Sequence, residues 1–328
     1  MKIGIIGLGS MGKRRLRLLT EFFPEITLVG VDSRNDRQEE VQNIFKIKTF
    51  ESLKDAVNEA KIEAVCICTS PISHESIILE ALKTNLHVFT EINLLNNYYE
   101  EAIALAEEKK LHLYLSSTFL HRREIKLLEE AIKQDSKVTY RYHVGQYLPD
   151  WHPWESYKEF FVANKKTNGC REIFAIELPW ITKVFGSIES FELQKQKLSS
   201  LDIDYPDNYV LMVKHASGIV GTLNVNILSR VAKRDLDIIG EQTQISWDGS
   251  PEGLYKWDET SKEMKKKDLY AGYIDDKSYS KTIIEDAYLE EIREYISLLK
   301  GEITETLYSF EKDQAIIELI NQFEGDLS

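Results

Sequence analysis

Cysteine is scarce in this chain of 328 residues, basic residues are outnumbered by acidic ones, and long apolar runs are lacking; each of these features excludes a class of protein. Three cysteines are too few for a disulfide framework, and we interpret Cys66 and Cys68, which alternate with apolar residues, as strand packing rather than metal ligands. We therefore expect no metal site. A formal net charge of -13 argues against nucleic-acid binding, because affinity for a phosphate backbone comes from clustered Lys and Arg. Without a run of about 18 apolar residues or a signal peptide, we expect a soluble, cytoplasmic protein with no membrane contact.

The N-terminal stretch carries the strongest motif. An apolar run ending at Ile6 is followed by Gly7-Leu8-Gly9-Ser10-Met11-Gly12, a helical pattern, a second apolar run and Asp32. A dinucleotide-binding turn has this order of features: a strand, a glycine turn, a helix, a second strand, and an acid about 20 residues further on. Gly7 would allow the tight turn, Gly9 the approach of a pyrophosphate, and Gly12 close packing of helix on strand. The phosphates would lie over the helix N-terminus, where unpaired N–H groups favour negative charge.

Asp32 indicates which dinucleotide is preferred. A carboxylate at the end of the second strand can accept both ribose hydroxyls of NAD and repel a 2′-phosphate, so we favour NAD as the cofactor. Arg34 keeps NADP open, because a guanidinium two residues further on can pair with that phosphate.

The order of the predicted elements defines the fold class. Strands and helices alternate over about the first 115 residues, which predicts a parallel sheet with right-handed crossovers. Beyond a helix predicted at 122–133, consecutive strands with short turns favour a largely antiparallel sheet. The chain is therefore predicted to be α/β. A Rossmann doubly wound parallel sheet would form at 1–120, and an α/β domain with an open, mostly antiparallel sheet at 121–328.

Three segments of the second half stand out. Gly145 to Trp154 is an aromatic loop that is costly to leave in water, so we expect it to fold over a ligand or against the domain's own helices. A helix is predicted from Arg171 to Phe185, with Pro179 breaking it or ending its first half. The Lys-rich stretch at 262–267 is interpreted as a solvated loop.

These motifs together resemble the Gfo/Idh/MocA family, the superfamily of glucose-fructose oxidoreductase and inositol dehydrogenase. The resemblance covers nearly the whole chain and rests on Gly7–Gly12, Cys68-Thr69-Ser70-Pro71 with His74, His87–Glu91, Asp207–Val210, Ser217–Gly221, Ser229-Arg230, Arg234–Leu236 and Ile239-Gly240. It implies a Rossmann domain followed by an α/β domain that presents the substrate and often mediates oligomers, here a homodimer or homotetramer. It also implies hydride transfer between a nicotinamide cofactor and the hydroxyl of a sugar, nucleotide sugar or cyclitol.

The resemblance also implies a set of cofactor contacts. These contacts would reach every part of the cofactor: the pyrophosphate, the adenosine ribose, the channel toward the nicotinamide, and the nicotinamide side. The residues that the resemblance implies are Gly7, Gly9, Ser10, Met11, Gly12, Asp32, Ser33, Arg34, Thr69, Ser70, Pro71, His74, Glu91 and Asn93.

The catalytic positions depart from the family pattern. The family's Glu-Lys-Pro reads Glu91-Ile92-Asn93 here, so an isoleucine stands where a lysine usually supports the reacting hydroxyl. Counting back from Gly186, the positions that often carry Asp, His and Asp fall on Ile173, Ile176 and Pro179. Isoleucine cannot exchange a proton, so the usual acid/base set is missing.

Four residues are candidates to replace that set. Glu177 is a candidate proton carrier, and Arg171 is suited to a bidentate grip on a carboxylate or phosphate of the substrate. His152 and Tyr147, in the aromatic loop, are the other proton-capable groups. The alternative reading is that Glu172 and Glu177 are only salt-bridged helix residues.

Two functions follow from this sequence. The leading hypothesis is an NAD(P)-dependent oxidoreductase acting on a sugar, nucleotide-sugar or cyclitol hydroxyl, because the cofactor half is intact. The alternative is a catalytically altered or inactive relative that senses a dinucleotide or supports a partner subunit, because the polar residues expected at Ile92, Ile173 and Ile176 are absent.

Overall fold

The computed structural model describes residues 1–152, 155–270 and 284–325. They form two compact units: Met1–Ser117 with Leu289–Ile317, and Thr118–Tyr288 with Glu318–Ser328. The expected division after residue 120 assigns all C-terminal helices to the second domain, whereas the first unit takes up residues 289–317. The divisions near the C-terminus fall within helices α8 (Glu285–Leu299) and α9 (Phe310–Glu324). Among the described residues no helix is long and apolar enough to span a membrane.

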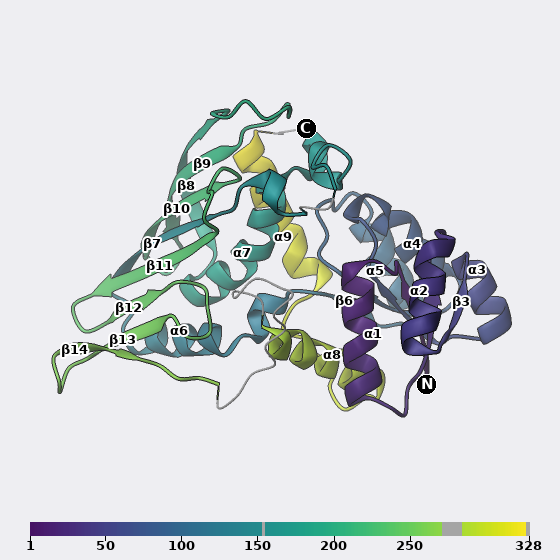
Figure 1. Ribbon diagram of the computed structural model, residues 1–328. Helices are drawn as coiled ribbons and strands as arrows, with labels where there is room; N and C mark the ends of the chain where they lie inside the picture. Colours follow the sequence, from purple (N-terminus) through teal and green to yellow (C-terminus); the bar gives the residue numbers. More distant parts are fainter. Residues whose placement is uncertain (153–154, 271–283, 326–328) are drawn as a thin grey trace. The chain divides into compact units, whose positions relative to one another are not determined.

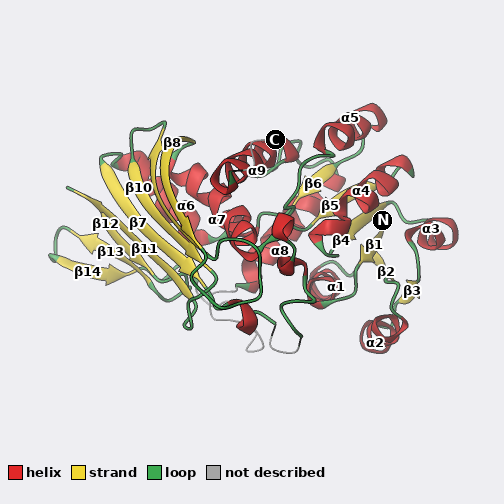
Figure 2. Ribbon diagram, turned by 90° about the horizontal axis from the view of Figure 1, so that it is seen from above, coloured by secondary structure: helices red, strands yellow, loops and turns green. Residues whose placement is uncertain are grey.

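The first unit contains a six-stranded parallel sheet in the order β3-β2-β1-β4-β5-β6. This is the strand order of a dinucleotide-binding Rossmann fold, and it confirms the predicted parallel sheet. Helices α1 and α2 lie on one side of the sheet and α4 and α5 on the other (Figure 2). The elements are β1 Lys2–Ile6, α1 Ser10–Phe22, β2 Thr27–Val31, α2 Asn35–Phe45, β3 Lys48–Phe50, α3 Leu53–Asp55, β4 Ala64–Ile67, α4 His74–Lys83, β5 His87–Thr90, α5 Tyr99–Lys109 and β6 Leu113–Leu115.

A buried ion-pair network fixes helix α1 within this unit. Arg15 on α1 is fully buried; its Nε donates to Glu91 Oε1 at 2.7 Å and its Nη2 to Glu291 Oε2 at 2.6 Å. Glu91 follows β5 and Glu291 lies on α8, so one guanidinium joins three elements. Glu291 also accepts hydrogen bonds from the Ser116 hydroxyl and the Ser117 amide. Burial raises the pKa of Glu291.

The second unit contains an eight-stranded sheet in the order β14-β13-β12-β11-β7-β10-β9-β8. All its neighbouring strands are antiparallel except β7 and β10, so the mostly antiparallel sheet is confirmed. Helices α6 and α7 lie against one face of the sheet (Figure 1). The elements are α6 Arg123–Gln134, β7 Val138–Gly145, α7 Gly169–Phe185, β8 Ile188–Gln196, β9 Asn208–His215, β10 Val220–Asn226, β11 Lys233–Gly240, β12 Gln244–Trp247, β13 Leu254–Asp258 and β14 Glu263–Lys266.

Helix α7 is continuous, so the predicted break at Pro179 is wrong. The helix begins where the Asn168 side chain accepts a hydrogen bond from Arg171 N–H, and it ends at Gly186, whose φ is +95°. Pro179 lies inside it and leaves one backbone carbonyl without its usual donor. An interior proline costs about 3 kcal/mol. Thirteen of the helix's seventeen residues are buried, and that packing outweighs the loss.

The Lys-rich segment is also different from its prediction. Glu263–Lys266 forms the edge strand β14, which pairs antiparallel with β13. Lysines on an edge strand keep their ammonium groups in water while the backbone completes a ladder, and they hinder pairing with another chain. Charge alone therefore did not distinguish an edge strand from a loop.

Replacement of Arg15 should destabilise the first unit. Arg15→Met leaves Glu91 and Glu291 buried without their cation, and we expect a loss of about 3–5 kcal/mol in the free energy of unfolding. The deficit should grow as the pH rises above about 5, because unpaired buried carboxylates resist ionisation. Urea unfolding at several pH values measures both effects.

Lys13→Met is the matched control for this variant. Lys13 lies on the same helix but forms an exposed pair with Glu40, so its loss should cost less than about 1 kcal/mol. Equal losses for the two variants would contradict the role given to Arg15.

Candidate functional site

The glycine turn of the first unit is shaped for an anionic ligand. Gly7 has a φ of +88°, and a Cβ on Gly12 would lie 1.9 Å from Gly7 O, so neither position tolerates a side chain. Gly9 precedes α1 without a side-chain cap, and the first turn of α1 has no acidic residue. The first amides of α1 therefore point outward uncapped by any side chain, the arrangement that binds phosphate groups.

Asp32 closes this turn from behind. It follows β2 and is largely buried; its Oδ2 accepts Leu8 N–H at 2.8 Å, and its Oδ1 accepts Arg34 N–H at 3.0 Å. Arg37 Nη1 lies 3.6 Å from Oδ2. The Arg34 guanidinium turns away and pairs with Asp36, and Ser33 is exposed. The carboxylate thus holds the turn in place through two backbone hydrogen bonds.

The predicted residues after β4 and β5 are joined to each other. His74 is fully buried, with Nε2 3.0 Å from Thr69 O and Nδ1 2.7 Å from Asn93 Oδ1. Burial lowers the pKa of His74, which favours the neutral form of the ring. It acts here as a brace between two loops. Glu91 is held by Arg15, and Ser70 is exposed while Pro71 is buried.

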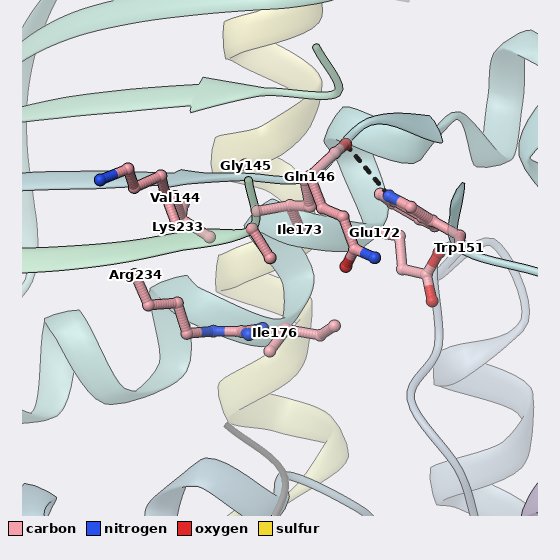
Figure 3. A pocket seen from close by; sticks show the side chains of 10 residues that line it. Val144, Gly145, Gln146, Trp151, Glu172, Ile173, Ile176, Lys233 and Arg234 are labelled. Carbon is pink, nitrogen blue, oxygen red and sulfur yellow. Dashed lines mark hydrogen bonds between the residues drawn. The ribbon is translucent and has the colours of Figure 1, made fainter. Parts of the chain in front are cut away.

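A pocket of about 150 Å³ lies within the second unit (Figure 3). Ile173 and Ile176, the positions expected to be polar in the family pattern, both line it. Its remaining lining residues are Val144, Gly145, Gln146, Trp151, Glu172, Ala232, Lys233 and Arg234.

Glu172, for which the sequence left open the interpretation of a salt-bridged helix residue, is one of the side chains that line this pocket. Its Oε2 is sealed from solvent and has no hydrogen-bond partner among the described residues. Burial raises the pKa of Glu172 to about 8. A neutral carboxyl group with an unused oxygen in a pocket can exchange a proton with a ligand near neutral pH. The sealed, unpartnered Oε2 reveals this, and a sequence does not display it.

Glu177, the predicted proton carrier, is instead saturated by donors. It is buried and accepts hydrogen bonds from Tyr142 Oη at 2.8 Å, Trp180 Nε1 at 2.6 Å and Arg234 Nε at 2.9 Å. A buried carboxylate that accepts three hydrogen bonds serves to position the groups that donate them. Glu177 therefore fixes Arg234, whose side chain lines the pocket.

The other predicted catalytic residues lie outside the pocket lining. Arg171 is buried and donates to Glu324 Oε2 and, at 2.7 Å, to Asn321 Oδ1, so its guanidinium is used within the unit. His152 Nδ1 lies 2.6 Å from Glu155 Oε1, and the Tyr147 ring is covered by Arg230 at 3.5 Å. Trp151 brings the aromatic loop into the pocket, while Trp154 lies outside the described residues.

The described residues contain no group of three or more His, Cys, Asp or Glu side chains that could hold a metal ion. The three cysteines are free thiols.

Fold and site define a class of protein. A Rossmann sheet whose glycine turn is open to phosphate, joined in one chain to an α/β unit with its own pocket, is a two-domain dinucleotide-binding protein. Residues 1–117 match the model of the oxidoreductase family with an NAD-binding Rossmann fold. This match covers about a third of the chain and agrees with the resemblance seen in its motifs, and the description of the matched family names NAD as the cofactor.

Three known proteins illustrate what the chain is similar to. Myo-inositol 2-dehydrogenase of Thermotoga maritima is 29% identical over 136 residues, 40% of this chain and 41% of that protein. Inositol 2-dehydrogenase of Leifsonia xyli is 22% identical over 272 residues, 78% of this chain and 75% of that protein. The structure of the WlbA dehydrogenase from Chromobacterium violaceum, in complex with NADH and UDP-GlcNAcA, superposes with a TM-score of 0.73 at 17% identity, covering 98% and 92% of the two chains. The last comparison confirms the α/β fold class.

The raised pKa of Glu172 predicts a pH dependence of stability. Its folded value of about 8 exceeds the ordinary 4.5, so the folded state binds the extra proton. Stability is greatest below the ordinary value and falls as pH rises toward about 8. Glu172→Gln should remove this fall. In thermal unfolding, the stability of the variant relative to the wild type should therefore increase between about pH 5 and pH 8.

Glu130→Gln, an exposed glutamate on α6, serves as the control and should follow the wild type. Parallel pH profiles for wild type and Glu172→Gln would mean that Glu172 is not held protonated.

Proposed function

We propose that this protein is an NAD(P)-dependent oxidoreductase that transfers a hydride to or from the hydroxyl carbon of a sugar, nucleotide sugar or cyclitol. The observation that carries the proposal is the uncapped start of α1 at the Gly7–Gly12 turn, with Asp32 fixed behind it. The names of the two inositol dehydrogenases and of the WlbA dehydrogenase support the substrate class.

The residues present fit a dinucleotide. A Cβ at Gly12 would collide with Gly7 O, so the glycines keep the backbone open where a pyrophosphate would lie. The amides of Ser10, Met11 and Gly12 would hold the phosphates, and Asp32 the ribose. When bound, the nicotinamide supplies or accepts the hydride.

The chain's own task is then to place the substrate and manage one proton. Glu172 is the group in the pocket suited to that exchange, because its Oε2 is unpartnered among the described residues and its pKa is about 8. At neutral pH it is mainly protonated and so donates to a carbonyl oxygen as that carbon is reduced. Above about pH 8 it is ionised and accepts the proton of an alcohol that is oxidised. Gln146 and Trp151 supply further polar and aromatic contacts for a polyol.

The alternative is a relative without turnover that senses a dinucleotide or supports a partner subunit. Ile173 and Ile176 favour it, because two apolar side chains line the pocket where proton-active groups are expected in the family pattern. A sensor of this kind would bind the cofactor without oxidising or reducing any polyol.

We further propose that the protein acts in the cytoplasm as a homodimer or homotetramer, with the second unit as its substrate and assembly domain. The second sheet carries exposed apolar side chains on its strands, at Val210, Met212 and Val220. Light scattering coupled to gel filtration measures the assembly.

Two measurements separate oxidoreductase from sensor. Calorimetry should show binding of NAD(H) or NADP(H). If neither cofactor binds, both the oxidoreductase and the sensor hypotheses are contradicted. A turnover screen with nucleotide sugars, sugars and cyclitols, in both directions, should then find hydride exchange in at least one member. Cofactor binding with no exchange across the panel favours the sensor.

Glu172→Gln tests the proton carrier once a substrate is found. We expect kcat to fall by about 100-fold or more while cofactor affinity stays within about twofold, because general acid/base catalysis contributes that much and the cofactor residues lie in the other unit. In the wild type, reduction should lose rate as pH rises through about 8 and oxidation should gain it. Unchanged kcat in the variant would remove Glu172 from the mechanism.

A further inference from the structure

Arg37, which the sequence motifs do not mark, lies across the glycine turn of the first unit. It is in the first turn of α2, and its Nη1 is 3.6 Å from Asp32 Oδ2. A Cβ built on Gly9 would lie 3.7 Å from the same Nη1 and 3.9 Å from Cζ. The guanidinium therefore lies over Gly9 on one side and beside Asp32 on the other.

Asp32 alone is a weaker barrier to a 2′-phosphate than its position suggests. Each carboxylate oxygen already accepts one backbone N–H, from Leu8 or from Arg34. Its charge also has a cation next to it in Arg37. Repulsion of a phosphate by the carboxylate is reduced where a guanidinium stands beside it.

Arg34, the residue expected to meet such a phosphate, is committed elsewhere. Its guanidinium forms a two-pronged pair with Asp36, and more than half of its side chain is exposed. Arg37 is about 39% exposed and keeps one face toward the turn.

We propose that Arg37 is the residue that determines cofactor specificity, and that it binds the 2′-phosphate of NADP so that the protein accepts NADP as well as NAD. A planar guanidinium with several donors matches a phosphate and forms charge-assisted hydrogen bonds to it. When NAD is bound, the same site would hold the two ribose hydroxyls. Asp32 can still accept hydrogen bonds from them, and Arg37 would add little to the affinity for NAD. This inference rests on the proposed function only in requiring that the glycine turn binds a dinucleotide.

Fluorescence titration of NADH and NADPH tests the assignment without any substrate. The proteins compared are the wild type, Arg37→Gln and the control Arg34→Gln. The wild type should bind both nucleotides. Arg37→Gln should weaken the affinity for NADPH by about tenfold or more and the affinity for NADH by less than about threefold. The reason is that only NADPH has the 2′-phosphate whose charge-assisted hydrogen bond the variant loses. Arg34→Gln should leave both within about twofold.

Retained NADH affinity in Arg37→Gln also shows that the variant is folded. Binding of NADH but not NADPH by the wild type, or equal losses for both nucleotides in Arg37→Gln, would overturn the inference while the proposed function stands. A larger loss of NADPH in Arg34→Gln would overturn it in favour of Arg34. Binding of neither nucleotide by the wild type would overturn both proposals.

Discussion

The buried guanidinium of Arg15 is the interaction on which the first unit depends. It lies between Glu91 after β5 and Glu291 on α8, and removing its charge would leave two carboxylates in a site closed to water. Arg15 is about 1.4 turns from the start of α1, so the interactions that fix this residue also help to fix the amides proposed to hold the cofactor phosphates. The proposed anion site at the helix N-terminus is therefore supported by a buried charge network on the same helix. A cofactor contact predicted for Glu91 has to share that carboxylate with Arg15.

Helix α7 of the second unit carries two glutamates whose surroundings differ. Glu172 and Glu177 are five residues apart on α7, about 140° around the helix, and they face different surroundings. Glu177 receives three donors and serves to hold Arg234 at the pocket. Glu172 receives none among the described residues, and its carboxyl group keeps its proton. The two glutamates therefore differ in their surroundings: Glu177 positions a cation at the pocket, and Glu172 is the proposed proton carrier.

Much of the fold was predictable because backbone rules leave a mark in the sequence. Gly7 and Gly12 are required by a positive φ and a close approach, and the alternation of strands and helices dictates a parallel sheet. The errors came where tertiary packing outweighed a local rule. Pro179 stays within a helix because the surrounding core stabilises that helix, and Glu263–Lys266 forms a strand because β13 offers it a ladder. Neither neighbour can be seen from the local sequence.

The two halves of the candidate site also differ in how far the sequence predicts them. Its cofactor half depends on main-chain groups, and the residues that expose them are glycines and one acid at fixed spacing. Its catalytic half depends on which side chains are left without partners, and that is decided by contacts far apart in the chain. Arg171 has the chemistry to grip an anion but is used by Glu324, and Arg34 is used by Asp36. Glu172, which the sequence left open as a salt-bridged helix residue, and Arg37, which no motif marks, are the side chains proposed to meet ligands instead. Residue type states what a group can do, whereas its internal partners decide whether it is available to do so.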